Sequence, residues 1–205
     1  MSALTTEFKS KIEKKIEEIE SKCSLEIVPV ISKRSSYYWK TRLVLSGLIF
    51  GALLLTLEFY PSWKWTFEAE LFICASLSLF VFLLSFWPYF LRMYLPEFIQ
   101  AEAVKTEAEA IYISEKLVET KKKTGILIFV AEFERKVWVL ADKGLVEAFP
   151  DYFFSELGQK LAIDFNHRSP GETFMKALEE LSNKIPEQLK GSDSHNELSN
   201  KIREH

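Results

Sequence analysis

The sequence LVLSGLIFGALLLTLEFY, at Leu43–Tyr60, is followed after a short break by a second apolar stretch, LFICASLSLFVFLLSFWPYFL, at Leu71–Leu91. Helices of these lengths would be roughly 27–31 Å long, close to the ~30 Å hydrocarbon core of a bilayer. Glu58, at the end of the first stretch, is the one charged residue in both. A helical hairpin buried in a soluble bundle would instead show polar residues at every third or fourth position. The pattern therefore predicts a transmembrane hairpin.

The charges beside the hairpin predict its orientation. Basic residues cluster outside it, whereas the loop between the stretches holds Lys64 against Glu68 and Glu70. The positive-inside rule then places both termini in the cytoplasm, and we expect an integral protein of a bacterial inner membrane. The same side chains could contact lipid phosphates, but a role in topology is the commoner one. These membrane-flanking basic residues are Lys33, Arg34, Lys40, Arg42 and Arg92.

Composition excludes several classes of function. The net charge of −3 and the absence of a basic stripe with interleaved aromatic residues argue against nucleic acid as a partner. The two cysteines, Cys23 and Cys74, form no disulfide framework or metal-binding spacing. The expected partners are the lipid bilayer and another membrane protein or complex.

The segments beside the hairpin read as two halves of one soluble domain. Residues 4–39 form the first part, 41–91 the hairpin, 96–189 the second part and 190–205 a flexible polar tail. Apolar residues at helical spacing predict helices, and short β-rich runs predict strands. Pro29 suggests an edge position or a bulge for the first strand. The predicted elements are helices at 4–22, 96–123, 151–166 and about 169–185, and strands at 25–31, 126–130 and 137–140.

Connection lengths predict how these strands pair. The last two strands are separated by a turn of a few residues, so they form an antiparallel hairpin. The first strand and Ile126–Val130 are separated by the membrane stretches and a helix, which is enough chain for a parallel crossover. The predicted fold is therefore a three-layer α/β domain interrupted by a two-helix transmembrane hairpin.

The run TGILIFVAEFERKVWVLADKGL, at Thr124–Leu145, resembles the second half of the TPM domain. The upstream run LEIVPVISKRSSYY resembles the first strand of that family, and LGQKLAIDFNHRSPGETFMKALEELSNKI resembles its closing helices. The subgroup with a membrane hairpin inside the domain is the most similar. In this resemblance Glu134 and Arg135 match the acidic-Arg turn of the family, and Gly144 matches the glycine that closes the strand pair.

The resemblance implies a Rossmann-like α/β sandwich and two classes of activity. Some family members are acid phosphatases, and others are factors that assemble or repair membrane protein complexes. A divalent cation is associated with the fold. Both classes stay open for this chain, because fold resemblance does not by itself assign a function.

The residues favour neither class sharply. Cys23 has no histidine close in sequence, His167 is expected to cap a helix, and no glycine-rich phosphate loop follows a strand. Phosphatase chemistry would rest on carboxylates that hold Ca²⁺ or Mg²⁺. An antiparallel hairpin separates Glu132 and Glu134 from Asp142, so these three cannot share one ion. The candidate carboxylates are Glu132, Glu134, Asp142, Glu147, Asp151 and Asp164.

The trio Asp142, Glu147 and Asp151 could share a cation if Gly144 allowed a tight turn. The commoner outcome for such residues is a solvated carboxylate. We therefore expect a docking, assembly or repair factor first, and a metal-dependent phosphatase at the cytoplasmic membrane surface second.

Overall fold

The structure is a computed structural model that describes residues 6–59, 66–115, 117, 123–189, 191 and 200–204. The chain divides into two units, which are described separately. Unit 1 comprises residues 1–35 and 100–205, and unit 2 comprises residues 36–99. Unit 1 is a mixed α/β domain.

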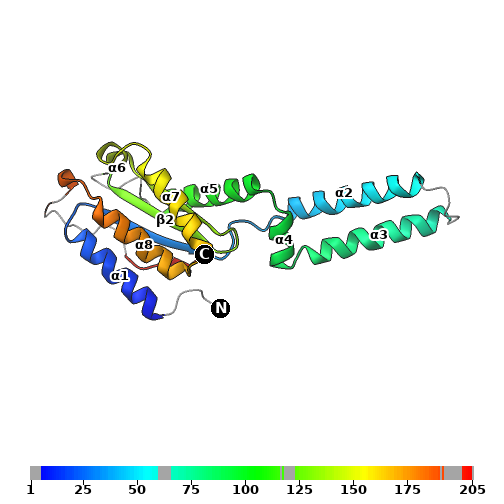
Figure 1. Cartoon of the computed structure of the whole chain (residues 1–205), viewed down its shortest axis with the longest axis horizontal. Coiled ribbons are helices and arrows are strands. Elements are labelled where there is room, and N and C mark those ends of the chain that lie inside the picture. The colour runs from blue at the N-terminus through cyan, green and yellow to red at the C-terminus, as the bar shows by residue number, and fades with distance from the viewer. Residues whose placement is uncertain are drawn as a thin grey trace. The chain divides into compact units, whose positions relative to one another are not determined.

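A mixed sheet forms the centre of unit 1 (Figure 1). Its order is β3 (Lys136–Ala141), β2 (Gly125–Ala131), β1 (Glu26–Ser32) and the two-residue β4 (Arg203–Glu204). The strands β1 and β2 are parallel over seven residues, from Glu26 opposite Gly125 to Ser32 opposite Ala131. The strands β2 and β3 are antiparallel, as the short turn predicts. Because β1 precedes unit 2 and β2 follows it, the domain closes across the hairpin.

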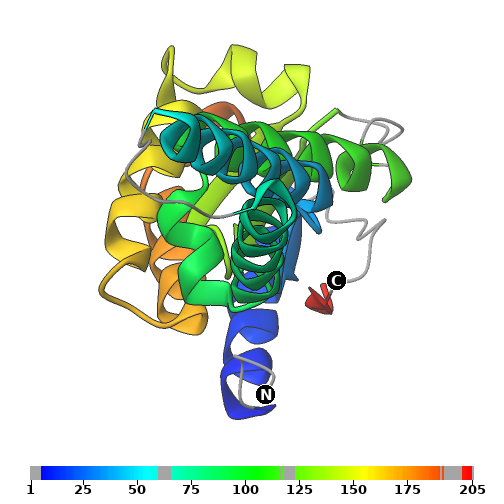
Figure 2. The same cartoon turned by 90° about the vertical axis from the view of Figure 1, so that its right-hand side faces the viewer.

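Alternating side chains of β2 fill two apolar cores. Ile126, Ile128 and Val130 join the core under α1 (Thr6–Glu20), α7 (Phe153–Phe165) and α8 (Pro170–Asn183). On the other face, Leu127 and Phe129 pack with Val104, Ala108 and Ile111 of α5 (Glu97–Ser114). Figure 2 shows the yellow and orange helices α7 and α8 on one side of the sheet and the green helix α5 on the other. Helices therefore cover both faces, which explains why β2 is apolar throughout.

Local sequence signals explain where α8 begins. Ser169 accepts a hydrogen bond from the Glu172 N–H, and the Glu172 carboxylate accepts one from the Ser169 N–H at 2.9 Å. Pro170 occupies the first helical position, where a missing N–H costs nothing. This capping box confirms the helix start expected from the sequence.

Unit 2 contains α2 (Trp39–Glu58), α3 (Phe67–Leu84) and α4 (Pro88–Tyr94). The helices α2 and α3 are long and apolar enough to cross a membrane, by length and composition alone. They are joined by a hydrogen bond of 2.9 Å from the Ser78 hydroxyl to the Ser46 carbonyl oxygen.

The second apolar stretch is not one helix from Leu71 to Leu91. It begins earlier, at Phe67, because Thr66 caps the helix by accepting a hydrogen bond from the Ala69 N–H. It ends at Leu84, and α4 starts at Pro88, which has no N–H to continue a helical ladder. The first stretch also begins earlier than expected, at Trp39, so residue 39 belongs to α2.

Three further differences concern unit 1. The helix expected to reach residue 123 ends at Ser114, and residues 118–122 lie outside the described residues. A short helix α6 (Lys143–Ala148) follows β3, where none was expected. In the segment expected to be a flexible tail, Arg203 and Glu204 pair with Val30 and Ile31 of β1.

The outer edge of β1 explains the position of Pro29. The Glu26 N–H donates toward β2, to the Thr124 carbonyl oxygen, whereas the Ile27 N–H donates to the Glu20 carboxylate at 2.8 Å. Successive backbone N–H groups of a strand point to opposite sides, so Pro29 shares the direction of Ile27. Its missing N–H therefore faces away from β2, which confirms the edge interpretation.

The other edge of the sheet is covered by a helix. A Cβ atom on Gly158 of α7 would lie 3.7 Å from the Val137 carbonyl oxygen and 3.8 Å from the Val139 nitrogen. Both groups lie on the outer side of β3. The Asp142 N–H donates to the Gly125 carbonyl oxygen of β2, and backbone groups alternate in direction along a strand. The even-numbered residues of β3 therefore face β2, and Val137 and Val139 face away from it. Close approach of α7 thus shields an edge that could otherwise pair with another chain.

Closure across the hairpin predicts that unit 1 folds without unit 2. Replacing residues 36–99 with a short Gly/Ser linker should leave a soluble protein with one cooperative melting transition, because loop-closure entropy depends only weakly on loop length. The transition is measured by circular dichroism. Adding Ile128→Asp should abolish it, since this change buries an unpaired charge in a side-chain position that is 1% exposed. A linker variant without a sigmoidal melt would contradict a single interrupted domain.

Burial of Glu20 predicts that stability depends on pH. Desolvation raises the pKa of Glu20 from 4.5 to about 7, so the folded state binds a proton more tightly than the unfolded chain. The stability this proton provides is complete below about pH 4.5 and is lost as pH rises through 7. Glu20→Gln should therefore remove a decrease in the free energy of unfolding between pH 5 and pH 8, measured by denaturant titration.

The matched control for this prediction is Glu18→Gln. Hydrogen bonds from Lys22 and Lys15 lower the pKa of Glu18 to about 2, so this exposed carboxyl stays ionised from pH 5 to pH 8. The control should keep the pH dependence of the wild type. An unchanged slope in Glu20→Gln would show that Glu20 is ionised in the fold throughout this range.

Candidate functional site

The carboxyl ends of β1 and β2 lie at the same edge of the sheet, at Ser32 and Ala131. In open α/β sheets this edge is where ligands usually bind. The chain leaves β1 here toward unit 2, and the turn between β2 and β3 contains Glu134 and Arg135. We call residues 32–35 and 132–135 together the carboxyl-edge site.

Glu134 points into the carboxyl-edge site. Its side chain is 2% exposed, and its Oε1 accepts a hydrogen bond of 3.0 Å from the Ser35 N–H. A buried carboxylate that accepts a backbone N–H holds that backbone in place, because the pairing offsets part of the cost of burial. Glu134 thus ties the β2–β3 turn to the chain that leads into α2.

Arg135 points elsewhere. Its φ of 53° lies in the left-handed region, and its Nη1 donates a hydrogen bond of 3.1 Å to the Phe165 carbonyl oxygen. Its guanidinium also lies 5.1 Å from the centre of the Phe165 ring. The helix dipole stabilises a cation at the carboxyl end of α7. Arg135 therefore joins the β2–β3 turn to this helix.

Backbone contacts reinforce the carboxyl-edge site. The Glu132 N–H donates to the Ser32 carbonyl oxygen at 2.9 Å, and the Phe133 N–H donates to the Lys33 carbonyl oxygen at 3.2 Å. The Arg34 guanidinium lies 4.6 Å from the centre of the Phe133 ring. Glu134 and the backbone of the β2–β3 turn therefore form a structural clamp on the exit of β1, whereas Arg135 joins the turn to α7.

Sequence reasoning missed the polar residues next to this clamp. The buried Ser32 hydroxyl donates to the Glu107 carboxylate of α5 at 3.3 Å. Ser35 Oγ and Glu107 Oε2 are buried at this edge, with no hydrogen-bond partner in the part of the chain that the structure describes. The run of small polar residues directly after a buried strand was the signal that could have indicated them.

Asp142 lies at the opposite end of the β2–β3 hairpin, as expected. It is the N-cap of α6, where its Oδ1 accepts a hydrogen bond of 2.7 Å from the Lys143 N–H. It also lies close enough to Tyr112 to contribute, after burial, to raising the pKa of that phenol to about 12. Gly144 lies in the first turn of α6, so it does not form the tight turn expected of it.

The structure does not gather the three carboxylates proposed as metal ligands. Glu147 forms an exposed ion pair of 3.7 Å with Lys143, and Asp151 is exposed before α7. Within the described residues, which include all three, no group of three His, Cys, Asp or Glu side chains is arranged to hold a metal ion. In this arrangement Asp142, Glu147 and Asp151 do not fit a shared cation, and the metal stays a prediction.

Asp164 and His167 make contacts that stabilise the fold at the end of α7. Asp164 forms an ion pair with Lys176 of α8, and the hydrogen bond from Lys176 lowers the pKa of the Asp164 carboxyl. His167 follows the end of α7, and its N–H donates to the Asp164 carbonyl oxygen at 2.9 Å. This contact agrees with the helix-capping position expected for His167.

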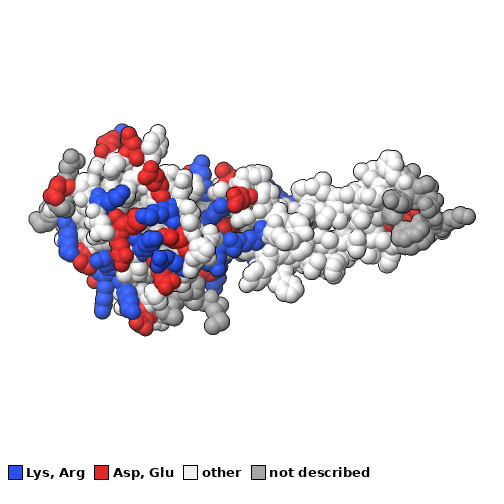
Figure 3. Space-filling view, viewed as in Figure 1, with Lys and Arg blue, Asp and Glu red and all other residues white. Residues whose placement is uncertain are grey.

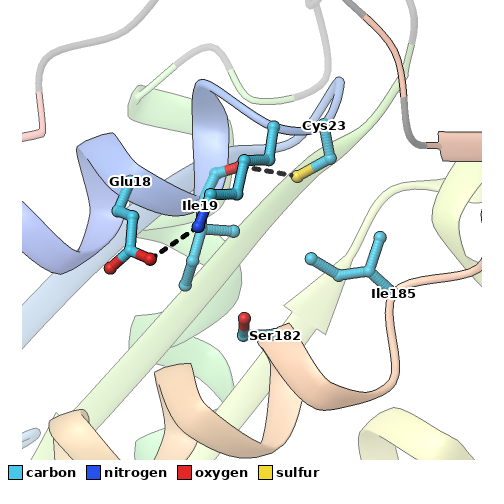
Figure 4. Close-up of a pocket in the computed structure, with 6 residues that line it drawn as sticks. Glu18, Ile19, Cys23, Ser182 and Ile185 are labelled. Carbon is cyan, nitrogen blue, oxygen red and sulfur yellow. Dashed lines mark hydrogen bonds and ion pairs between the residues drawn. The ribbon is translucent and has the colours of Figure 1, made fainter.

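A small pocket of about 190 Å³ lies between the ends of α1 and α8 (Figure 4). The Cys23 thiol donates to the Ile19 carbonyl oxygen at 2.9 Å, and burial raises its pKa to about 11. A thiol that stays protonated at neutral pH is a poor nucleophile. The volume is also below the roughly 300 Å³ at which ligand pockets usually begin. The pocket lining comprises Glu18, Ile19, Lys22, Cys23, Ser182 and Ile185.

The membrane-flanking basic residues are divided between the two units. Lys33 and Arg34 belong to unit 1. In unit 2, the Lys40 ammonium lies 5.8 Å from the centre of the Trp39 ring, and Arg42 is 6% exposed with its guanidinium 4.4 Å from the Phe86 ring centre. Arg92 lies in the last turn of α4.

The second half of this chain matches the model of a known protein family. Residues 93–184 match the model of the TPM domain. The matched region contains α5, β2, β3, α6, α7 and α8, and it includes the whole β2–β3 turn with Glu134 and Arg135. The TPM match thus agrees with the resemblance carried by Thr124–Leu145.

A solved structure supports the fold as a whole. The chain is similar to the BA42 protein from the psychrophilic bacterium Bizionia argentinensis, known from an NMR structure, with a TM-score of 0.60 and 16% sequence identity. The likeness covers 98% of this chain and 95% of BA42. At this identity it shows a shared fold alone. A search among curated proteins found no match.

The clamp at the carboxyl-edge site predicts a cost for losing Glu134. Glu134→Ala removes an acceptor from the Ser35 N–H and should lower the free energy of unfolding by about 1.5–3 kcal/mol, the range for hydrogen bonds to charged groups. Glu147→Ala is the control, because its exposed ion pair should contribute less than about 1 kcal/mol. Both values come from denaturant unfolding. Equal losses in the two variants would contradict the clamp.

Proposed function

We propose that this chain is a membrane-anchored TPM-like module that docks on another membrane protein or complex during its assembly or repair. In this proposal unit 1 is a Rossmann-like, three-layer TPM-type domain, and unit 2 is a transmembrane hairpin inserted in it. The observation that carries the proposal is an α/β domain interrupted by two apolar helices whose described side chains stay largely exposed.

The surfaces of α2 and α3 support insertion in a bilayer. Only 6% of each candidate span is buried, so most side chains of these helices stay at least partly exposed. In Figure 3 the visible surface of these helices is almost entirely white, whereas unit 1 carries mixed positive and negative charge. Apolar surface of this extent requires lipid or another protein. Exposed large side chains on these helices include Val44, Leu48, Leu55, Phe72, Leu79, Phe80 and Leu83.

The basic residues support the orientation. Lys33 and Arg34 precede α2, and Arg92 follows α3, whereas Glu68 and Glu70 lie in the first turn of α3. The positive-inside rule therefore favours unit 1 on the cytoplasmic side of an inner membrane. Unit 1 would act within reach of other proteins of the same membrane.

Exposed apolar residues of unit 1 supply a surface for docking. Tyr152 is 81% exposed with a φ of 64°, and Ile163 of α7 is 67% exposed. Val146 of α6 is also more than half exposed. Tyrosine is enriched at protein interfaces, and the buried centre of an interface is more apolar than the rest of the surface.

The alternative is a metal-dependent phosphatase at the cytoplasmic membrane surface. It would need Asp142, Glu147 and Asp151 to converge on Ca²⁺ or Mg²⁺. The carboxylate of Asp142 is engaged as a helix cap and that of Glu147 in an ion pair. For this reason we rank the docking function first.

Co-purification of the full chain in mild detergent tests the docking function. A membrane protein that co-purifies with the wild type should be reduced at least about fivefold by the double change Tyr152→Ser and Ile163→Ser, because truncating interface anchors commonly costs more than 1 kcal/mol each. Quantitative mass spectrometry measures the amount. The matched control is Ile113→Ser on α5, which is 69% exposed. Identical partner recovery from all variants would contradict docking through this surface.

A further inference from the structure

The outer edge of β1 offers backbone pairing at only one part of its length. At its start, the Ile27 N–H is taken by the Glu20 carboxylate, and Pro29 has no N–H. Among the described residues, another strand pairs here only after Pro29, with Val30 opposite Arg203 and Ile31 opposite Glu204 in parallel (Figure 2, red beside blue). An extended segment can therefore add to this sheet at one register.

Side chains fix the segment that lies on this edge. The Arg203 Nε is 2.5 Å from the Glu115 Oε2, and the two side chains are only 19% and 24% exposed. The preceding residue, Ile202, packs against the main apolar core. Asn200 lies near Glu20, where its side chain favours the charged carboxylate. Residues 200–204 thus present an aliphatic residue followed by arginine, in extended form.

The hold on residues 200–204 is weak compared with the rest of the sheet. The ladder between β1 and β4 is two residues long, whereas the ladder between β1 and β2 is seven. The segment can therefore leave the edge without unfolding the domain.

We propose that the outer edge of β1, together with Glu115, is a recognition site for an extended segment of a partner protein that carries an aliphatic residue followed by arginine. Residues 200–204 occupy this site until such a segment displaces them. Main-chain pairing then supplies affinity, and the Glu115 carboxylate supplies selectivity for arginine. This inference rests on the proposed docking function and names the kind of segment that is docked.

The peptide Asn-Lys-Ile-Arg-Glu, the sequence of residues 200–204, is the probe for this site. It carries a fluorophore, and its binding to the full chain in detergent is followed by fluorescence anisotropy. Arg203→Ala weakens the contact between residues 200–204 and the edge of β1, so a larger fraction of the protein has a vacant site. Because the apparent affinity is proportional to this fraction, the change should tighten peptide binding about tenfold. Lys143→Ala on α6, whose side chain is 79% exposed, is the control and should leave the affinity unchanged.

Glu115 provides the second arm of the experiment. The double variant Arg203→Ala with Glu115→Gln should lose the gain, and the peptide Asn-Lys-Ile-Ala-Glu should bind Arg203→Ala at least tenfold more weakly than the parent peptide. Thermal melts check that each variant is folded. Equal binding of the peptide to Arg203→Ala and to the double variant would overturn the site, as would binding that Arg203→Ala does not tighten.

Two other outcomes would also overturn it. A wild-type dimer that dissociates in Arg203→Ala, without peptide binding, would assign the edge to residues 200–204 of a second copy. Absence of peptide binding while Tyr152 and Ile163 still control co-purification would remove this site and leave the docking function in place.

Discussion

The parallel pairing of β1 with β2 is the constraint on which the rest of unit 1 depends. These strands lie on opposite sides of residues 36–99 in the sequence, yet they pair over seven residues and are buried on both faces. The entropic cost of closing a long loop grows only slowly with length, so a hairpin inserted at this point is tolerated. Both cores then form on strands that this pairing brings together.

The same pairing determines what happens at the carboxyl edge. In many α/β sheets this edge binds a ligand, but here the chain must leave it directly for an apolar helix. The Glu134 carboxylate accepts a hydrogen bond from the Ser35 N–H, and backbone N–H groups of the β2–β3 turn donate to the carbonyl oxygens of residues 32 and 33. Glu134 thus stabilises the chain where it leaves β1, whereas its neighbour Arg135 contacts α7.

The two edges of the sheet are treated differently. On β3, α7 approaches so closely at Gly158 that the outer backbone groups are covered. On β1, a buried carboxylate and a proline occupy the first part, and residues 203–204 occupy the next. A covered edge resists pairing with other chains, whereas an edge held by two residues permits exchange. This asymmetry makes β1 the edge at which a partner segment can bind.

The sequence by itself determined the apolar hairpin, the strands β1, β2 and β3, their parallel and antiparallel pairing and the capping box at Ser169, because these depend on local periodicity and connection length. It also placed Asp142 and Glu134 at opposite ends of the β2–β3 hairpin. It did not indicate β4. Only the tertiary structure decided that Asp142 caps a helix, that Glu134 clamps the β1 exit and that Arg203 reaches Glu115. Each of these roles depends on which distant backbone or side chain lies within hydrogen-bond distance, and local sequence patterns do not encode that distance.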